Sequence, residues 1–247
     1  MWIVLRPEHK IHLSQAAFAQ ANIDAVGLAL QSILPSDNVG ELVQQMGFEQ
    51  CDRIIFTSKI AAQLSLPFIP DLPSSTYIYG VGKTTFQTLA QWTQQYPFWC
   101  NNHQLMMPQV DQQTSEGLLQ LPSMQSVSGK SVIIVKGHGG RNALAQQLGS
   151  RGADVQECCV YSRTQLSSPI ASQPWELADI TGMIVTSHEQ LQLAFDVYPH
   201  FWLSSLKWIM ASQRIADYAS TLGIHNITIA QGADDAALIH SVQHLME

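Results

Sequence analysis

The sequence has little charge, no basic excess and no long apolar run, and each absence excludes a class of protein. Only 13% of its 247 residues are charged and the formal net charge is −7, which argues against a nucleic-acid partner, since phosphate binding needs a basic surface. No apolar stretch approaches the roughly 20 residues that cross a bilayer. The first residues, MWIVLRPEHK, lack the basic region of a signal peptide. We therefore expect a cytoplasmic protein with neither a nucleic acid nor a membrane as partner.

Cysteine is scarce, and its spacing indicates neither a disulfide framework nor a metal site. Cys51 and Cys100 are isolated, and no pair has the C-x-x-C spacing of redox and zinc motifs. Cys158 and Cys159 are adjacent in a predicted strand, where successive side chains point to opposite faces. We therefore predict reduced thiols, the usual state in the cytosol.

Motifs for hydrolytic and metal chemistry are also missing. There is no G-x-S-x-G, and no local His-Asp pattern accompanies Ser58 or Ser187. His240 and His244 have the i, i+4 spacing of a metal-binding pair. No third ligand lies near them in the sequence, so a solvated helix face is the favoured interpretation and no metal is predicted.

The hydrophobic fraction of 46% is enough for a substantial core, and one stretch shows how that core is built. Residues 131–135 form a short apolar, β-branched run that predicts a buried strand. Glycines follow, residues 142–149 then have helical spacing, and residues 155–160 form a second extended run that reaches Tyr161. A strand, a glycine turn and a helix together present backbone N–H groups to an anion.

The glycine turn itself has the composition of an anion site. Lys136 and Arg141 flank Gly137 and Gly139, and His138 between the glycines is a candidate substrate contact. An ordinary βαβ unit with a glycine turn remains an alternative, because a single glycine loop is a weak signal. The spacing is not G-x-G-x-x-G and no Gly-Lys-Ser/Thr follows it, so nucleotide binding is not indicated.

The chain contains two copies of one strand-turn-helix pattern. Residues 54–58 and 183–187 are both a strand followed by Thr-Ser. Each Thr-Ser pair is followed, at nearly the same distance, by a second strand, a turn of small residues and a helix. The turn is at Gly82 in the first copy and at Ser212 in the second. A strand at residues 2–5 completes the second copy. The pattern predicts two similar parallel-sheet α/β lobes, one of which is discontinuous in the chain.

The predicted lobes are joined by two extended segments, which we expect to pair as a two-stranded connector. Residues 164–174, TQLSSPIASQP, are predicted to be a linker, because serine and proline interrupt any periodicity. The predicted boundaries are 1–27 with 167–247 for lobe 1, 41–154 for lobe 2, and 28–40 with 155–166 for the connector.

Ligands of open parallel sheets bind beyond the carboxyl ends of the strands, and small hydroxyls, glycines and cations gather there in this chain. The hydroxyls also suit helix N-caps, and the two roles are compatible, because a capped helix start still offers N–H groups. No pair of acids is present. Two classes of function fit: a two-lobed enzyme that closes on an anionic metabolite, and a non-catalytic two-lobed sensor of the periplasmic-binding type.

Several motifs connect nearly the whole chain to a known family. They are IIFTS at 54–58, SEGLLQLP at 115–122, GHGGR with RGADV and CCVYSR at 137–163, MIVTS at 183–187 and SQRIADYASTLG at 212–223. On these motifs the sequence resembles the uroporphyrinogen-III synthases. The resemblance implies a HemD-like fold of two lobes with flavodoxin-like topology, and it favours the enzyme over the sensor.

The resemblance also implies a reaction. A cyclising hydro-lyase of tetrapyrrole (haem) biosynthesis would convert hydroxymethylbilane to uroporphyrinogen III, with loss of water and inversion of ring D. No cofactor or metal is implied. The expected partner is the small-molecule tetrapyrrole, with a transient contact to the preceding pathway enzyme, and a monomer is expected.

Residue roles follow from the same resemblance. Tyr161 matches the tyrosine that the family is thought to use near the leaving hydroxyl; a tyrosine that packs between lobes is the alternative. Arg214-Ile215 stands where certain members carry a Thr pair, so Arg214 would supply charge, and Phe86 stands where a small residue is usual. The expected substrate-binding residues are Arg6, Thr57, Ser58, Gly82, Thr85, Lys136, Gly137, Gly139, Arg141, Thr186, Ser187, Ser212 and Arg214.

Overall fold

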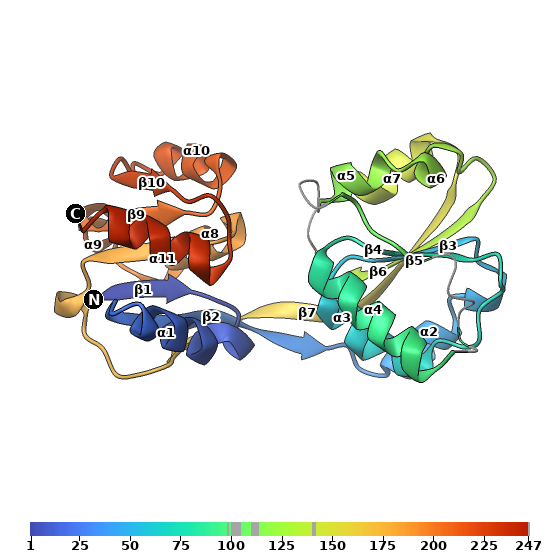
Figure 1. Cartoon of the computed structure of the whole chain (residues 1–247), viewed down its shortest axis with the longest axis horizontal. Helices are drawn as coiled ribbons and strands as arrows, with labels where there is room; N and C mark the ends of the chain where they lie inside the picture. Colours follow the sequence, from blue (N-terminus) through green and yellow to red (C-terminus); the bar gives the residue numbers. More distant parts are fainter. Residues whose placement is uncertain (98, 100–104, 110–113, 140–141, 247) are drawn as a thin grey trace. The chain divides into compact units, whose positions relative to one another are not determined.

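A computed structural model describes residues 1–97, 99, 105–109, 114–139 and 142–246 (Figure 1). The chain divides into two compact units. Unit 1 comprises Met1–Ser32 and Thr164–Glu247, and unit 2 comprises Ile33–Arg163. Both are mixed α/β structures built on parallel strands. No helix in the described part of the chain is long and apolar enough to cross a membrane.

Unit 2 has its strands in the order β5-β4-β3-β6-β7, with every neighbouring pair parallel. Its strands are β3 (Arg53–Phe56), β4 (Tyr77–Gly80), β5 (Leu105–Met106), β6 (Ser131–Gly137) and β7 (Asp154–Ala171). Its helices are α2 (Val39–Gln44), α3 (Lys59–Ser65), α4 (Lys83–Gln95), α5 (Ser115–Leu119), α6 (Pro122–Gln125) and α7 (Ala143–Ser150), with 3-10 turns η2 (Phe48–Gln50) and η3 (Leu66–Phe68).

The sheet of unit 2 is buried on both faces, which explains why β3 and β6 are continuous apolar runs rather than alternating ones. Ile54 and Ile133 pack with α2, α3 and α4 on one face. Ile55 and Ile134 pack with α5, α6 and α7 on the other. Helices therefore cover both sides of the strands, as Figure 1 shows for this unit.

Unit 1 repeats this arrangement in the order β10-β9-β8-β1-β2. Its strands are β1 (Trp2–Leu5), β2 (Ala25–Pro35), β8 (Gly182–Val185), β9 (Lys207–Met210) and β10 (Ile227–Ile229). Its helices are α1 (Ile11–Gln20), α8 (His188–Val197), α9 (His200–Ser205), α10 (Gln213–Thr221) and α11 (Asp235–His244), with 3-10 turns η1 (Glu8–Lys10) and η6 (Leu177–Asp179). Ile3 and Leu5 face α8, α9 and α10, whereas Trp2 and Val4 face α1 and α11.

Two elements differ from the sequence-based predictions. The prediction of a linker at residues 164–174 is wrong for most of this segment, because β7 continues to Ala171. Strand β7 is a sheet neighbour of β2, and just beyond its end the Ser172 amide donates to the Gly27 carbonyl oxygen at 2.9 Å. Pairing with a neighbouring strand outweighs the low strand propensity of this serine-rich segment. Strand β6 also runs two residues further than predicted, to Gly137.

Candidate active site

The carboxyl ends of the unit 2 strands carry the main group of candidate residues. Strand β3 is followed by Thr57 and Ser58, and Ser58 is the N-cap of α3. Strand β6 ends at Gly137, and its neighbour β7 places Tyr161 opposite this glycine. The structure thus brings Ser58, Gly137 and Tyr161 together at one edge of the sheet.

A β-bulge in β7 determines where the Tyr161 side chain points. Lys136 pairs with Cys159, but the next residue, Gly137, pairs with Tyr161, so Val160 is the additional residue. A bulge changes the face to which the following side chains point. Without it Tyr161 would face the side of Cys159; with it, Tyr161 lies in the same apolar cluster as Cys158 and Val160. The ring is 3% exposed.

The phenol of Tyr161 is held by three neighbours. Its oxygen lies 3.2 Å from Ser58 Oγ and accepts a hydrogen bond from Arg163 Nη2 at 3.3 Å. The Arg163 guanidinium carbon is 5.6 Å from the ring centroid, a cation–π distance. A Cβ on Gly137 would lie 2.5 Å from two ring carbons, so the ring packs directly on the glycine backbone. Arg163 is not among the residues expected from the sequence, although side chains two residues apart in a strand, such as those of Tyr161 and Arg163, point to the same face.

Ser58 and Ser187 occupy equivalent positions in the two units, and both cap a helix. Ser58 Oγ accepts from the Ala61 amide at 3.1 Å, and Ser187 Oγ accepts from the Gln190 amide at 3.2 Å. The capping role that the sequence allowed for these hydroxyls is therefore confirmed for both. In Ser58 the cap coexists with the Tyr161 contact.

We expect Ser58→Ala and Ser187→Ala each to lower the free energy of unfolding by about 1 kcal/mol, the usual cost of losing an N-cap. Urea denaturation followed by circular dichroism measures both values, with exposed Ser150→Ala as the control. A loss below about 0.3 kcal/mol in both variants would contradict the capping role.

Other unit 2 candidates differ in how much they can offer to a ligand. Thr57 Oγ1 donates to the Val135 carbonyl oxygen at 3.3 Å. Gly82 is the N-cap of α4 and has no side chain to make a capping hydrogen bond, so this helix start is suited to an anion. The Thr85 side chain is buried, at 3% exposure. Gly139 has φ +74°, a left-handed conformation that favours glycine.

Of the two cations expected on the glycine turn, the structure describes only Lys136. Lys136 lies inside β6, not on the turn, and is 8% exposed. Its Nζ donates to Glu157 Oε1 at 2.8 Å and to Asn142 Oδ1 at 3.4 Å. By strand alternation its side chain is on the opposite face from Gly137, so it does not join the Tyr161 group. Arg141 lies outside the described residues.

Arg6 in unit 1 is also engaged within the protein. Its guanidinium donates to Ser14 Oγ at 3.0 Å, to the Ala233 carbonyl oxygen at 2.8 Å and to Asp235 Oδ1, and the side chain is only 5% exposed. The contacts tie β1 to α1 and to the start of α11. The sequence could not show this, because Asp235 is 229 positions away.

We therefore expect Arg6→Met to lower the free energy of unfolding by about 2–4 kcal/mol, because it removes a buried ion pair and its hydrogen bonds. Arg214→Met is the matched control: Arg214 is exposed, and exposed substitutions usually change stability by less than about 0.5 kcal/mol. Equal stability of the two variants would contradict a structural role for Arg6.

The remaining unit 1 candidates lie at the starts of α8 and α10. Thr186 donates through its amide, at 3.3 Å, and its hydroxyl, at 3.0 Å, to Gln190 Oε1. Ser212 is the N-cap of α10 but its side chain makes no capping bond. The structure adds His188, whose ring stacks on Tyr218 at a centroid distance of 3.6 Å. No pattern in the sequence indicates this pair.

The described cysteines of unit 2 are unsuited to nucleophilic catalysis. Cys158 is buried and Cys159, its neighbour, is half-buried, as expected for opposite faces of a strand. Burial raises the pKa of the Cys158 thiol to about 11 and that of Cys51 to about 12. Because the thiolate is the nucleophile, thiols with such a raised pKa are inert at neutral pH.

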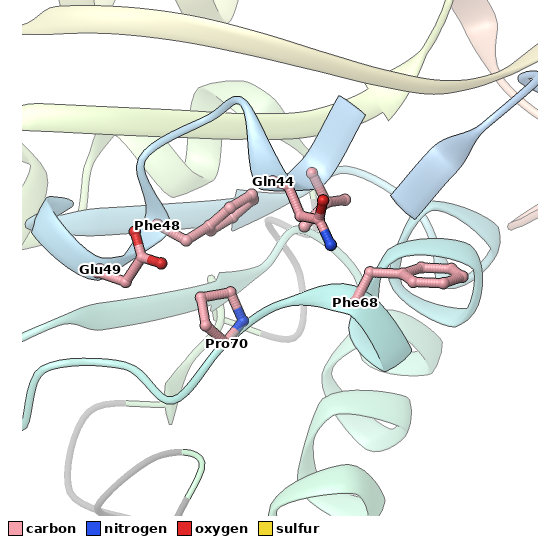
Figure 2. A pocket seen from close by; sticks show the side chains of 6 residues that line it. Gln44, Phe48, Glu49, Phe68 and Pro70 are labelled. Carbon is pink, nitrogen blue, oxygen red and sulfur yellow. The ribbon is translucent and has the colours of Figure 1, made fainter. Parts of the chain in front are cut away.

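A separate pocket of about 300 Å³ is formed by α2, η2 and η3 (Figure 2). It is lined by Val43, Gln44, Phe48, Glu49, Phe68 and Pro70. Phe68 follows the last turn of α3, whereas Ser58 precedes its first turn. The pocket is therefore at the other end of α3 from Tyr161, and it contains neither a cation nor a hydroxyl.

Comparisons with known proteins agree on one family. A family model described as uroporphyrinogen-III synthase HemD matches residues 13–240. The uroporphyrinogen-III synthase of Escherichia coli is 33% identical over 183 residues, which are 72% of this chain and 68% of that protein. That of Salmonella typhimurium is 32% identical over 180 residues, which are 69% of this chain and 68% of that protein.

Solved structures agree with this assignment at the level of the fold. A mutant uroporphyrinogen III synthase from the extremely thermophilic bacterium Thermus thermophilus has a TM-score of 0.65 at 11% identity, over 100% of this chain and 99% of that chain. Uroporphyrinogen-III synthetase from Helicobacter pylori has a TM-score of 0.60 at 17% identity, over 98% of each chain. Together with the match to the family model, the sequence identity shows that the chain belongs to the uroporphyrinogen-III synthase family.

Proposed function

We propose that this protein is a uroporphyrinogen-III synthase, a cyclising hydro-lyase that converts hydroxymethylbilane to uroporphyrinogen III in tetrapyrrole biosynthesis. Membership of the family supports the reaction. The observation that carries the proposal in the structure is the Tyr161 phenol, fixed on Gly137 between Ser58 and Arg163. No cofactor or metal takes part in the proposed reaction.

In the proposed mechanism the Tyr161 phenol donates a proton to the terminal hydroxyl of the linear tetrapyrrole. That hydroxyl leaves as water while the electron-rich pyrrole beside it forms an azafulvene. Ring D then attacks through its substituted carbon, and the resulting spiro intermediate fragments and closes again with ring D inverted. The proton lost when the last ring regains aromaticity balances the one that Tyr161 donates. General acid assistance of this kind contributes roughly 10²–10⁴-fold.

The substrate carries many carboxylates, whereas the protein has a net charge of −7. We therefore propose that backbone amides and small hydroxyls at helix starts hold these groups, since helix N-termini attract anions locally whatever the net charge. The proposed contacts are Thr57, Gly82, Gly137 and Gly139 in unit 2, and Thr186, Ser187, Ser212 and Arg214 in unit 1. Ser58 would contribute through the backbone at the start of α3, because its hydroxyl contacts the Ala61 amide and Tyr161. Arg141 remains a proposed contact from the sequence. For Arg6 and Lys136, burial and internal contacts favour structural roles, and for Thr85 burial does.

The domain organisation is part of the proposal. Two lobes with flavodoxin-like topology, 1–27 with 167–247 and 41–154, would be joined by an extended two-stranded connector, 28–40 with 155–166. The identical strand order of the two units and the passage of β2 and β7 from one unit into the other support it.

The cellular setting is proposed from the chemistry. A cytoplasmic monomer suits the free thiols of Cys51, Cys158 and Cys159. The tetrapyrrole is its proposed partner, with a transient contact to the enzyme that makes hydroxymethylbilane, and no nucleic acid or membrane is involved.

The experiment that tests this function is an assay of hydroxymethylbilane consumption. The purified chain should accelerate the loss of substrate in proportion to protein concentration, with no added metal or cofactor. A chain that binds hydroxymethylbilane and leaves its spontaneous cyclisation unchanged would be a binding protein instead, and the proposal would fail.

A further inference from the structure

The phenolic oxygen of Tyr161 lies between two polar side chains whose hydrogen-bonding capacities differ. Arg163 Nη2, at 3.3 Å, can only donate, because a guanidinium has no acceptor. Ser58 Oγ, at 3.2 Å, already accepts the Ala61 amide hydrogen. Its own hydrogen is therefore available for donation, and the Tyr161 oxygen lies within reach. With Arg163 and Ser58 both donating, the two lone pairs of the phenolic oxygen are used and its own hydrogen is not.

We propose that Ser58 and Arg163 are positioning residues that direct the Tyr161 hydroxyl hydrogen toward the leaving hydroxyl of the substrate. The inference rests on the proposed function of Tyr161 as the general acid. Donors aimed at an oxygen that becomes negative as its proton departs stabilise the transition state more than the ground state. Arg163 adds a positive charge to this effect, and Ser58 links the oxygen to the start of α3.

The surrounding backbone restricts the movement of the Tyr161 ring. The ring cannot move toward the strand, because Gly137 is already in contact with it. The Tyr161 carbonyl oxygen accepts from the His138 amide at 2.6 Å, which holds the backbone directly after the bulge. The hydroxyl can rotate about its C–O bond, and this rotation is what Ser58 and Arg163 would control.

Arg163 is exposed, so a direct contact with a substrate carboxylate is the competing role. The two roles predict different kinetics. A positioning residue acts only through the Tyr161 hydroxyl and changes kcat. A carboxylate contact acts without that hydroxyl and changes KM.

The test is a double-mutant cycle on the full-length chain with hydroxymethylbilane as substrate. Arg163→Met should lower kcat about tenfold, in line with the loss of one charge-assisted hydrogen bond, with KM changed less than about twofold. Arg163→Lys should recover part of this loss. In the Tyr161→Phe background, Arg163→Met should change kcat by less than about twofold. Lys207→Met, which removes an exposed cation at the start of β9, is the control and should leave both constants unchanged.

Ser58 gives a second arm in which helix capping is preserved. Ser58→Thr keeps both the cap and a hydroxyl donor, whereas Ser58→Asp keeps a capping oxygen but cannot donate. The kcat of Ser58→Thr should exceed that of Ser58→Asp by about fivefold or more, and this ratio should disappear in the Tyr161→Phe background. Thermal unfolding checks that both variants are folded.

The positioning role would be overturned if Arg163→Met lowered kcat equally in the wild-type and Tyr161→Phe backgrounds, or if it changed KM alone. In both cases the acid role of Tyr161 would stand. Wild-type turnover by Tyr161→Phe itself would instead remove the acid role, and the inference with it. The two failures are therefore distinguishable.

Discussion

Tyr161→Phe should fold as the wild type does and lose most of its turnover, by up to roughly 10²–10⁴-fold, the range of general acid assistance. The substitution removes the hydroxyl that contacts Ser58 and Arg163 and leaves the ring on Gly137. Some activity should remain, because the leaving hydroxyl is expelled by an electron-rich pyrrole. Single-turnover and steady-state kinetics with hydroxymethylbilane measure the loss.

The residual product of Tyr161→Phe should still be mostly uroporphyrinogen III (isomer III), in which ring D is inverted, rather than isomer I, the product of direct closure without inversion. The reason is that the choice of ring D carbon depends on how the substrate is held. A Phe variant with wild-type kcat would rule out the acid role. A shift toward isomer I during enzymatic turnover would make Tyr161 a residue that positions the substrate rather than one that donates a proton.

Gly137→Ala should have an effect of similar size for a steric reason. The added Cβ would lie 2.5 Å from ring carbons of Tyr161 and 3.0 Å from its oxygen, so the phenol must move away from Ser58 and Arg163. We expect kcat to fall by about 100-fold or more, with a loss of roughly 1–3 kcal/mol in stability from overpacking.

Gly149→Ala is the matched control for Gly137→Ala. Gly149 lies in α7, and nothing is within 4 Å of the position of its added Cβ. Alanine at this helical position should raise stability by about 0.5–1 kcal/mol and leave turnover unchanged. Turnover by Gly137→Ala within about threefold of the wild type would show that the close packing of Tyr161 on β6 is not needed for activity.

Local sequence patterns were sufficient to predict most of the fold. The continuous apolar runs of β3 and β6 indicated strands buried on both faces, and the repeated Thr-Ser after β3 and β8 indicated two helix starts of the same kind. Residues 167–171, beyond the extended connector segment 155–166, were not predictable in this way, since they are extended because of the neighbouring strand β2 rather than their own composition.

The candidate site was less accessible to the sequence than the fold, because its geometry depends on register and on distant partners. The bulge at Val160 determines the face of the sheet to which the Tyr161 side chain points. No residue type at or beside Val160 indicates a bulge. Lys136 was expected among the anion-binding cations, yet its pairing with Glu157 depends on the alignment of β6 with β7. Arg163 could have been selected from its two-residue spacing to Tyr161 alone, because that spacing lies after the bulge.

The most direct test of the whole account is the isomer composition of uroporphyrinogen formed from hydroxymethylbilane by the wild-type chain. The products can be oxidised to uroporphyrins and separated by chromatography, with a protein-free reaction run in parallel. We expect isomer III to dominate when protein is present, whereas the protein-free reaction gives isomer I. A product that remains isomer I at every protein concentration would contradict the proposed function.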